Sequence, residues 1–229
     1  MANDKLAPSL IEILATTLRV LTFRATCDEM SNFHWRHLAL GLLCTWLAGI
    51  GRSWDDDTAS LLRMSGIGSV AYVFGLSLLL WLVVMPLCEG HTDYRRVLTF
   101  VCLTSPLGVL YAIPVERFMS RADALQMNVA FLTIVAVWRV ALLAFYWKRG
   151  VALTWVETFT STLLPLTIIV APLAVMRSAA RIMEAMGGLR DKGDLDPTSA
   201  VLDSLGALAI YRVVPLLIWH IALATQKNR

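Results

Sequence analysis

Two long apolar runs, residues 124–147 and 151–176, are separated only by the basic turn Lys148-Arg149-Gly150. Each run exceeds the roughly 20 helical residues that cross the ~30 Å hydrocarbon layer of a bilayer. Only helices and closed barrels satisfy their backbone hydrogen bonds inside that layer, so two such runs in succession indicate an antiparallel pair of membrane helices. This feature predicts a polytopic α-helical membrane protein.

Three further apolar runs, residues 66–88, 97–113 and 205–225, are also expected to be helical spans. Charged residues make up 16% of the chain, whereas soluble domains carry about 25%, and the charges cluster between the apolar runs. Six of the eight prolines lie inside or at the ends of apolar runs. Prolines at such positions predict kinked helices that pack against neighbours to satisfy the freed carbonyl groups.

The apolar run at residues 38–50 is short for a span, and it decides the number of crossings. Trp35 and Trp54 flank it as interface anchors would, which favours a crossing, whereas the distribution of Lys and Arg favours a chain in which it does not cross. We expect an all-α fold, a polytopic transmembrane helix bundle with kinked helices and six spans, five being the alternative. The N-terminus is expected to be cytoplasmic.

Residues 1–37 differ in character from the rest of the chain. Apolar residues recur along one side of an expected helix, but Glu12, Arg19 and Arg24 are too frequent for a membrane span. The pattern predicts an amphipathic helix that lies on the membrane surface, and a helix packed on the bundle is the alternative. We therefore divide the chain into a membrane-surface segment, 1–37, and a transmembrane helical domain, 38–229.

A polar stripe runs along the helix expected at 151–176. Thr154, Glu157, Thr158 and Ser161 are spaced three and four residues apart and so share one helical face. A polar face is unfavourable against lipid, so it is expected to meet other helices or water. If the helix begins at residue 151, Glu157 lies close in depth to Arg139 of the preceding helix. We predict an Arg139–Glu157 ion pair, the alternative being that each reaches the membrane interface separately.

The last apolar run contains a second arginine, Arg212, and His220. The stretches AVWRV at 136–140 and AIYRV at 209–213 both place an arginine after an aromatic residue, which is a weak sign of internal duplication and also arises by chance. Two intramembrane arginines outnumber the single intramembrane glutamate. The surplus charge is expected to receive an anionic group such as a lipid phosphate, with snorkelling or carbonyl contacts as the alternative.

Sequence signatures of catalysis are missing: the chain contains no HExxH, GxSxG, P-loop or GxGxxG pattern. His34 and His37 follow Cys27, Asp28 and Glu29, but their spacing matches no metal-binding motif. The four cysteines form no CxxC pair, and the net charge of +3 gives no case for nucleic acid. We expect no catalytic residue, no metal site, no cofactor and no nucleic-acid partner. The sequence leaves the question of an enzyme open and favours a protein that is not one.

The layout of an amphipathic N-terminal segment before five or six kinked spans resembles the Yip family of small membrane proteins. The run SPLGVLYAIPVER at 105–117 is similar to segments of uncharacterised bacterial membrane proteins. The resemblance covers about residues 30–180, and no site residue is carried over from it. It implies an integral membrane adaptor or organiser without catalysis.

We therefore expect a multi-pass protein of the cell inner (plasma) membrane that acts as a structural or adaptor component. The alternative is a transporter or lipid-handling protein that uses Arg139, Glu157 and Arg212. Expected partners are the lipid bilayer, including anionic lipid, and other membrane proteins or further copies of the chain.

Overall fold

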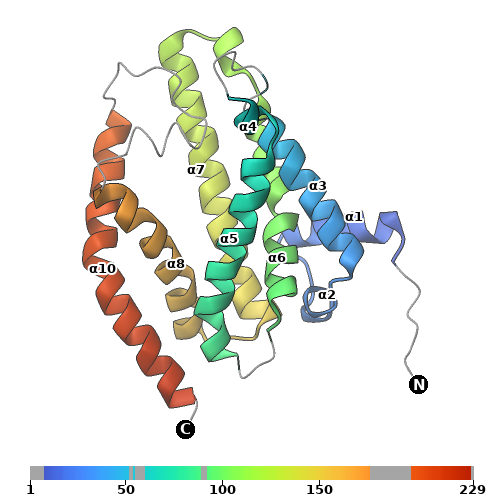
Figure 1. Ribbon diagram of the computed structural model, residues 1–229, viewed down its shortest axis with the longest axis vertical. Coiled ribbons are helices and arrows are strands. Elements are labelled where there is room, and N and C mark those ends of the chain that lie inside the picture. Colours follow the sequence, from blue (N-terminus) through green and yellow to red (C-terminus); the bar gives the residue numbers. More distant parts are fainter. Residues whose placement is uncertain (1–7, 52–53, 55–59, 89–91, 176–196, 228–229) are drawn as a thin grey trace.

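The computed structural model describes residues 8–51, 54, 60–88, 92–175 and 197–227, and its regular elements there are all helical (Figure 1). The longer helices are α1 (Leu10–Leu21), α3 (Trp35–Gly51), α5 (Ile67–Val84), α6 (Tyr94–Leu103), α7 (Arg121–Phe145), α8 (Trp155–Val175) and α10 (Pro197–Lys227). The short helices and helical turns are α2 (Cys27–Ser31), α4 (Leu61–Met64), η1 (Met85–Leu87), η2 (Ser105–Ala112), η3 (Val115–Arg117) and the π-turn η4 (Tyr146–Gly150). The predicted all-α class is confirmed.

Four helices of the described part are long and apolar enough to cross a membrane, which indicates a membrane-embedded protein. They are Ile67–Leu87, Asp123–Gly150, Trp155–Pro172 and Leu205–Lys227, and they coincide with four of the predicted spans. The predicted span 97–113, which contains Pro106, is divided into α6 and η2, which meet at Thr104. Pro106, which cannot donate a backbone hydrogen bond, lies in the first turn of η2 and accounts for the break.

The six longest helical segments stand along the long axis of the molecule, and successive ones run in opposite directions (Figure 1). These segments are α3, α5, α6 with η2, α7, α8 and α10. We call the end of the bundle that holds η4 and the C-terminus the lower end. Helix α8 contains Pro165 and Pro172, and its upper half leans toward α10 (Figure 1).

The best-buried side chains gather in the lower half of the bundle, around η4. Tyr146 and Trp147 of this π-turn are almost fully buried. The Tyr146 ring stacks on Phe100 of α6 with a centroid distance of 4.2 Å and an interplanar angle of 10°. Met30 of α2 belongs to the same cluster. The turn that joins α7 to α8 is therefore fixed by aromatic packing from elements distant in the sequence.

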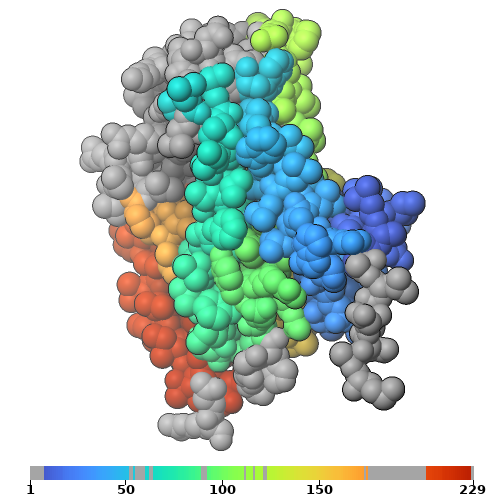
Figure 2. Space-filling model, turned by 45° about the vertical axis from the view of Figure 1, so that its right-hand side comes forward, coloured from blue at the N-terminus to red at the C-terminus, as the bar shows by residue number. Residues whose placement is uncertain are grey.

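Helix α1 lies across the bundle and protrudes from its side next to α3 (Figures 1 and 2). Ser9 and Glu12 cap its N-terminus reciprocally, and Arg19 forms an ion pair of 2.6 Å with Glu29. Its buried face contains Ile13, Thr16, Thr17 and Val20. Leu10, Ile11, Leu14 and Leu18 form an exposed apolar face on the same helix. Residues 10–21 are thus helical with apolar residues on two faces, and the predicted position on the membrane surface stays a prediction. The first seven residues of the predicted surface segment lie outside the described part.

Small residues allow neighbouring helices to approach closely. A Cβ atom built on Gly41 of α3 would lie 2.6 Å from Cys102 Cβ of α6, so a larger residue does not fit there. One turn further along α3, the Thr45 hydroxyl lies 2.7 Å from that of Ser105 in η2. The α3–α6–η2 contact thus combines a glycine contact with a buried hydrogen bond, as membrane helices commonly do.

Candidate functional site

Helix α8 begins at Trp155 because Thr154 and Glu157 cap it. The Glu157 backbone N–H donates to Thr154 Oγ1 at 3.3 Å, and Glu157 Oε2 accepts from the Thr154 backbone N–H at 2.7 Å. The Thr154 hydroxyl donates to the same carboxylate oxygen at 2.8 Å. This is a capping box, in which two otherwise unpaired N–H groups at the start of a helix are satisfied reciprocally.

The second carboxylate oxygen of Glu157 binds a lysine of α10. Lys227 Nζ lies 3.2 Å from Glu157 Oε1, which joins the last residue of α10 to the first turn of α8. Glu157 itself is only 7% exposed. Among the described residues its charged partner is Lys227, so the predicted Arg139–Glu157 pair is wrong.

The reason for that error is the start of α8. The prediction let a helix run from residue 151, but Val151–Thr154 form a non-helical connection and α8 starts at Trp155. Glu157 therefore lies in the first turn, close to the lower end of the bundle. Arg139 lies six residues before the end of α7, about 9 Å from it along the axis.

Arg139 is oriented toward α6. Its Nη2 donates to the Thr104 carbonyl oxygen at 3.5 Å, at the break between α6 and η2. The neighbouring indole of Trp138 donates from Nε1 to the Leu21 carbonyl oxygen at the end of α1, at 3.0 Å. This half-buried arginine thus binds a backbone carbonyl at an interrupted helix.

The remaining predicted site residues are distributed over different places. Ser161 and His220 are buried, and neither finds a hydrogen-bond partner among the described residues, although His220 lies against the Val83 carbonyl of α5. Arg212 is exposed on α10. Thr158 is 2% exposed and lies on the side of α8 that faces α7. The six residues do not form one cluster.

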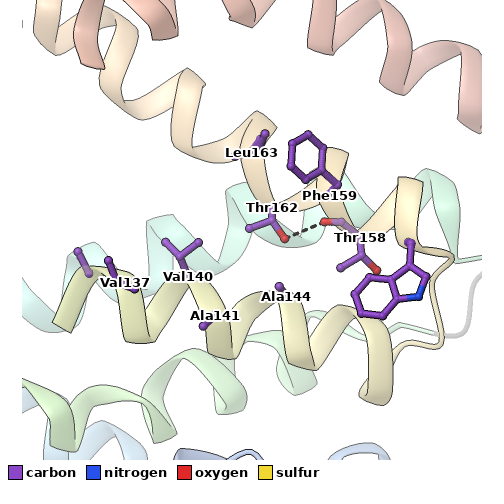
Figure 3. A pocket seen from close by; sticks show the side chains of 10 residues that line it. Val137, Val140, Ala141, Ala144, Thr158, Phe159, Thr162 and Leu163 are labelled. Atoms are coloured by element: carbon purple, nitrogen blue, oxygen red, sulfur yellow. Dashed lines mark hydrogen bonds between the residues drawn. The ribbon is translucent and has the colours of Figure 1, made fainter. Parts of the chain in front are cut away.

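A groove lies between α7 and α8, and Thr158 forms part of its lining (Figure 3). Its volume is about 700 Å³. The lining residues are Ala136, Val137, Val140, Ala141 and Ala144 of α7 and Trp155, Thr158, Phe159, Thr162 and Leu163 of α8. Small side chains on α7 leave this space next to the larger ones on α8. The groove is an apolar depression on the side of the bundle, of a size typical of ligand sites.

Two threonines supply the polar groups of this groove. The Thr162 hydroxyl donates to the Thr158 carbonyl oxygen at 2.7 Å, within α8 (Figure 3). The Thr158 hydroxyl is buried and has no hydrogen-bond partner among the described residues. A buried hydroxyl without a partner loses its hydrogen bonds to water. The wall of the groove therefore holds one buried hydroxyl without a partner among the described residues.

A lysine stands at the lower end of the groove. Lys148 Nζ donates to the Leu153 carbonyl oxygen at 3.0 Å and lies 5.1 Å from the centroid of the Trp155 ring. Trp155 is 72% exposed and lines the groove. Arg149 is the next residue and is exposed. The turn between the two helices thus provides two positive charges next to an apolar depression.

Cys88 lies just beyond the first membrane-crossing helix, near the Glu157–Lys227 pair. Burial raises the pKa of the Cys88 thiol, while a hydrogen bond with Thr92 and the charge of Lys227 act in the opposite direction. None of the four cysteines, all of which lie in the described part, forms a disulfide. Among the described residues no group of three His, Cys, Asp or Glu side chains is arranged to hold a metal ion.

Sequence reasoning noted Lys148 only as part of the basic turn, and it missed the Glu157–Lys227 ion pair and the groove. The motif T-x-x-E at 154–157 is typical of a capping box and predicts a helix start at this point. That prediction would have placed Glu157 in the first turn of the helix, at the lower end near Lys227. No sequence pattern pointed to the groove between α7 and α8.

Comparison with protein-family models, with curated proteins and with solved structures finds no match to this chain.

Proposed function

We propose that this chain is a multi-pass integral membrane protein that binds a membrane lipid, with an acyl chain lying in the groove between α7 and α8. It acts by binding, with no chemical step. The observation that carries this proposal is the groove itself, about 700 Å³ in volume and lined almost wholly by apolar side chains. Exposed Phe159 and Val137 flank it on the outer surface of two membrane-crossing helices. In a bilayer such a depression opens directly to lipid.

The proposal includes six membrane crossings. Helix α3 has 17 residues and a length of about 25 Å. Helix α6 and η2 together rise about 31 Å, close to the thickness of the hydrocarbon layer. Both fit the alternation of directions along the bundle (Figure 1). These lengths support two crossings in addition to the four long helices.

We place the protein in the cell inner membrane with its lower end and N-terminus on the cytoplasmic side, in a layout like that of the Yip family. The exposed apolar face of α1, with Leu10, Leu14 and Leu18, supports a position at the membrane surface. A reporter fused to the C-terminus tests this topology. Six crossings with a cytoplasmic N-terminus give a cytoplasmic signal, and an extracytoplasmic signal contradicts them.

Lipid retention tests the proposed function. The protein is extracted from bilayers in mild detergent, and its bound lipids are counted by native mass spectrometry. The wild type is expected to retain lipid, and Val140→Phe, which fills the groove, is expected to lose it. Val214→Phe on the 59% exposed surface of α10 is the matched control and is expected to retain it. Equal retention by both variants, or none by the wild type, contradicts the proposal.

A second candidate is the adaptor function, in which a helix of another membrane protein or of a second copy occupies the groove. Ala136, Val140 and Ala144 are spaced four residues apart and so share one face of α7, and the two alanines allow another helix to approach closely. A photocrosslinking amino acid at Val140 in native membranes separates the two candidates. A protein adduct supports the adaptor, and a lipid adduct supports the lipid-binding protein.

A further inference from the structure

We infer that the lipid bound between α7 and α8 is an acidic phospholipid, whose phosphate group is bound by Lys148. This inference rests on the proposed function and adds the headgroup class and the residue that selects it. It follows from three features at the lower end of the groove: a cation fixed in position, the lack of an acidic partner for it among the described residues, and a buried hydroxyl one helical turn deeper.

The position of the cation comes first. Lys148 Nζ is fixed by its bond of 3.0 Å to the Leu153 carbonyl oxygen and by the Trp155 ring at 5.1 Å. Because Trp155 also lines the groove, the ammonium group stands beside the opening through which a headgroup would emerge. An ammonium group has three N–H donors, and the Leu153 carbonyl takes one of them. Two donors remain for phosphate oxygens.

The charges around Lys148 favour a negatively charged headgroup. The nearest carboxylate along the chain, that of Glu157, is taken by the Thr154 cap and by Lys227. Among the described residues Lys148 has no acidic partner, and the adjacent Arg149 adds a second, exposed positive charge. A headgroup with a net negative charge therefore gains more here than a zwitterionic one.

The position of the buried Thr158 hydroxyl matches that of the ester groups of a phospholipid. Thr158 lies three residues beyond Trp155 on α8, about 5 Å deeper along the helix axis. Its hydroxyl has no partner among the described residues and is 2% exposed. Ester carbonyls lie directly below the phosphate in a glycerophospholipid and accept hydrogen bonds. The order of cation, hydroxyl and apolar groove thus follows the order of phosphate, ester and acyl chain.

A competition experiment tests this assignment. Native mass spectrometry of the full-length protein is carried out with equimolar phosphatidylglycerol and phosphatidylcholine that share the same acyl chains. The wild type is expected to prefer phosphatidylglycerol by about fivefold, the effect of one lysine near an anionic headgroup. Lys148→Gln is expected to reduce this preference to about one, and Lys148→Arg to restore most of it. Glycerol phosphate, which lacks acyl chains, is expected not to displace the lipid.

Arg95→Gln is the matched control, because Arg95 is an exposed cation on α6, at the same end of the bundle and outside the groove lining. It is expected to retain the full preference. Equal binding of the two lipids by the wild type overturns the inference, and so does an equal loss of preference in Lys148→Gln and Arg95→Gln. If both lipids bind equally and Val140→Phe removes both, the proposed function stands without the headgroup assignment. If the wild type retains no lipid, both fail.

Discussion

The two sides of α8 differ in how they meet their neighbours. Toward α10 the helices are joined at both ends: Gly206 lets α10 approach Ala174 at the upper end, and Lys227 binds Glu157 at the lower end. Toward α7 the helices are joined through η4, and above it the groove lies between them. One helix thus has a closed contact on one side and an open one on the other.

This difference follows from where the small residues lie. On the closed side a single glycine faces Ala174 directly, so small residues from both helices meet. On the open side the alanines of α7 face Trp155 and Phe159, which are large and 72% and 64% exposed. Small residues on both helices allow close approach, whereas here large side chains of α8 stand opposite the alanines and a groove lies between the two helices. The closed side is therefore expected to carry stability and the open side binding.

The largest effect is expected where the closed side is tightest. A Cβ atom on Gly206 would lie 2.4 Å from Ala174 Cβ, so Gly206→Leu must separate α8 from α10. We expect a loss of about 3 kcal/mol, at the upper end of the range for overpacking, seen as a lower thermal unfolding temperature in detergent. Gly75→Leu is the control, since nothing lies within 4 Å of a Cβ atom at Gly75. Similar unfolding temperatures for both variants would show that this contact is not tight.

Loss of the Glu157–Lys227 ion pair, at the lower end of the α8–α10 contact, is expected to have a smaller effect on stability. Lys227→Gln leaves the buried Glu157 carboxylate without its cation, which costs several kcal/mol for a fully buried pair. Because the Lys227 side chain is 30% exposed, we expect about 1–2 kcal/mol here. The double variant Glu157→Gln/Lys227→Gln should recover part of that loss in the same thermal assay. Strictly additive losses would mean that the two groups do not interact.

Thiol labelling compares the accessibility of Cys88, near the Glu157–Lys227 pair, with that of Cys27 on the protein surface. Because burial raises the pKa of the Cys88 thiol, less thiolate is present at pH 7 and the rise of labelling with pH is shifted upward. In single-cysteine variants we expect maleimide to modify Cys88 at least about tenfold more slowly than the exposed Cys27. Equal rates at pH 7 would contradict a closed lower end.

The smallest effect on stability is expected on the open side. Val140→Phe adds volume to a groove that already has space for it, so we expect a change of less than about 0.5 kcal/mol, although the variant should lose lipid. Thermal unfolding in detergent, with no added lipid, measures the first quantity separately from the second. A loss as large as that of Gly206→Leu would show that α7 and α8 pack as closely as α8 and α10.

The long apolar helices could be predicted from the sequence because length and hydropathy alone define them. The candidate site could not, because it depends on where a helix starts. The four residues Val151–Thr154 do not belong to α8, so the helix starts four residues later than predicted. Glu157 therefore lies in the first turn of α8 and pairs with Lys227 in place of the predicted Arg139. The groove depends on how far apart two helices stand, which is set by side chains on both. Periodicity in one helix does not contain that information.

The backbone conformation of the connection between α7 and α8 is not the one that its residues favour locally. Ala152 has a φ of +60°, a left-handed conformation that costs an alanine about 1 kcal/mol. Gly150 of the same connection lies so close to Met30 of α2 that a Cβ atom there would be 3.3 Å from Met30 Cβ. The connection between α7 and α8, the two helices that line the groove, is therefore held in part by α2, which lies about 120 residues earlier in the chain. A fragment restricted to α7 and α8 would form both helices without fixing the angle between them, so the groove belongs to the assembled chain and to no part of it alone.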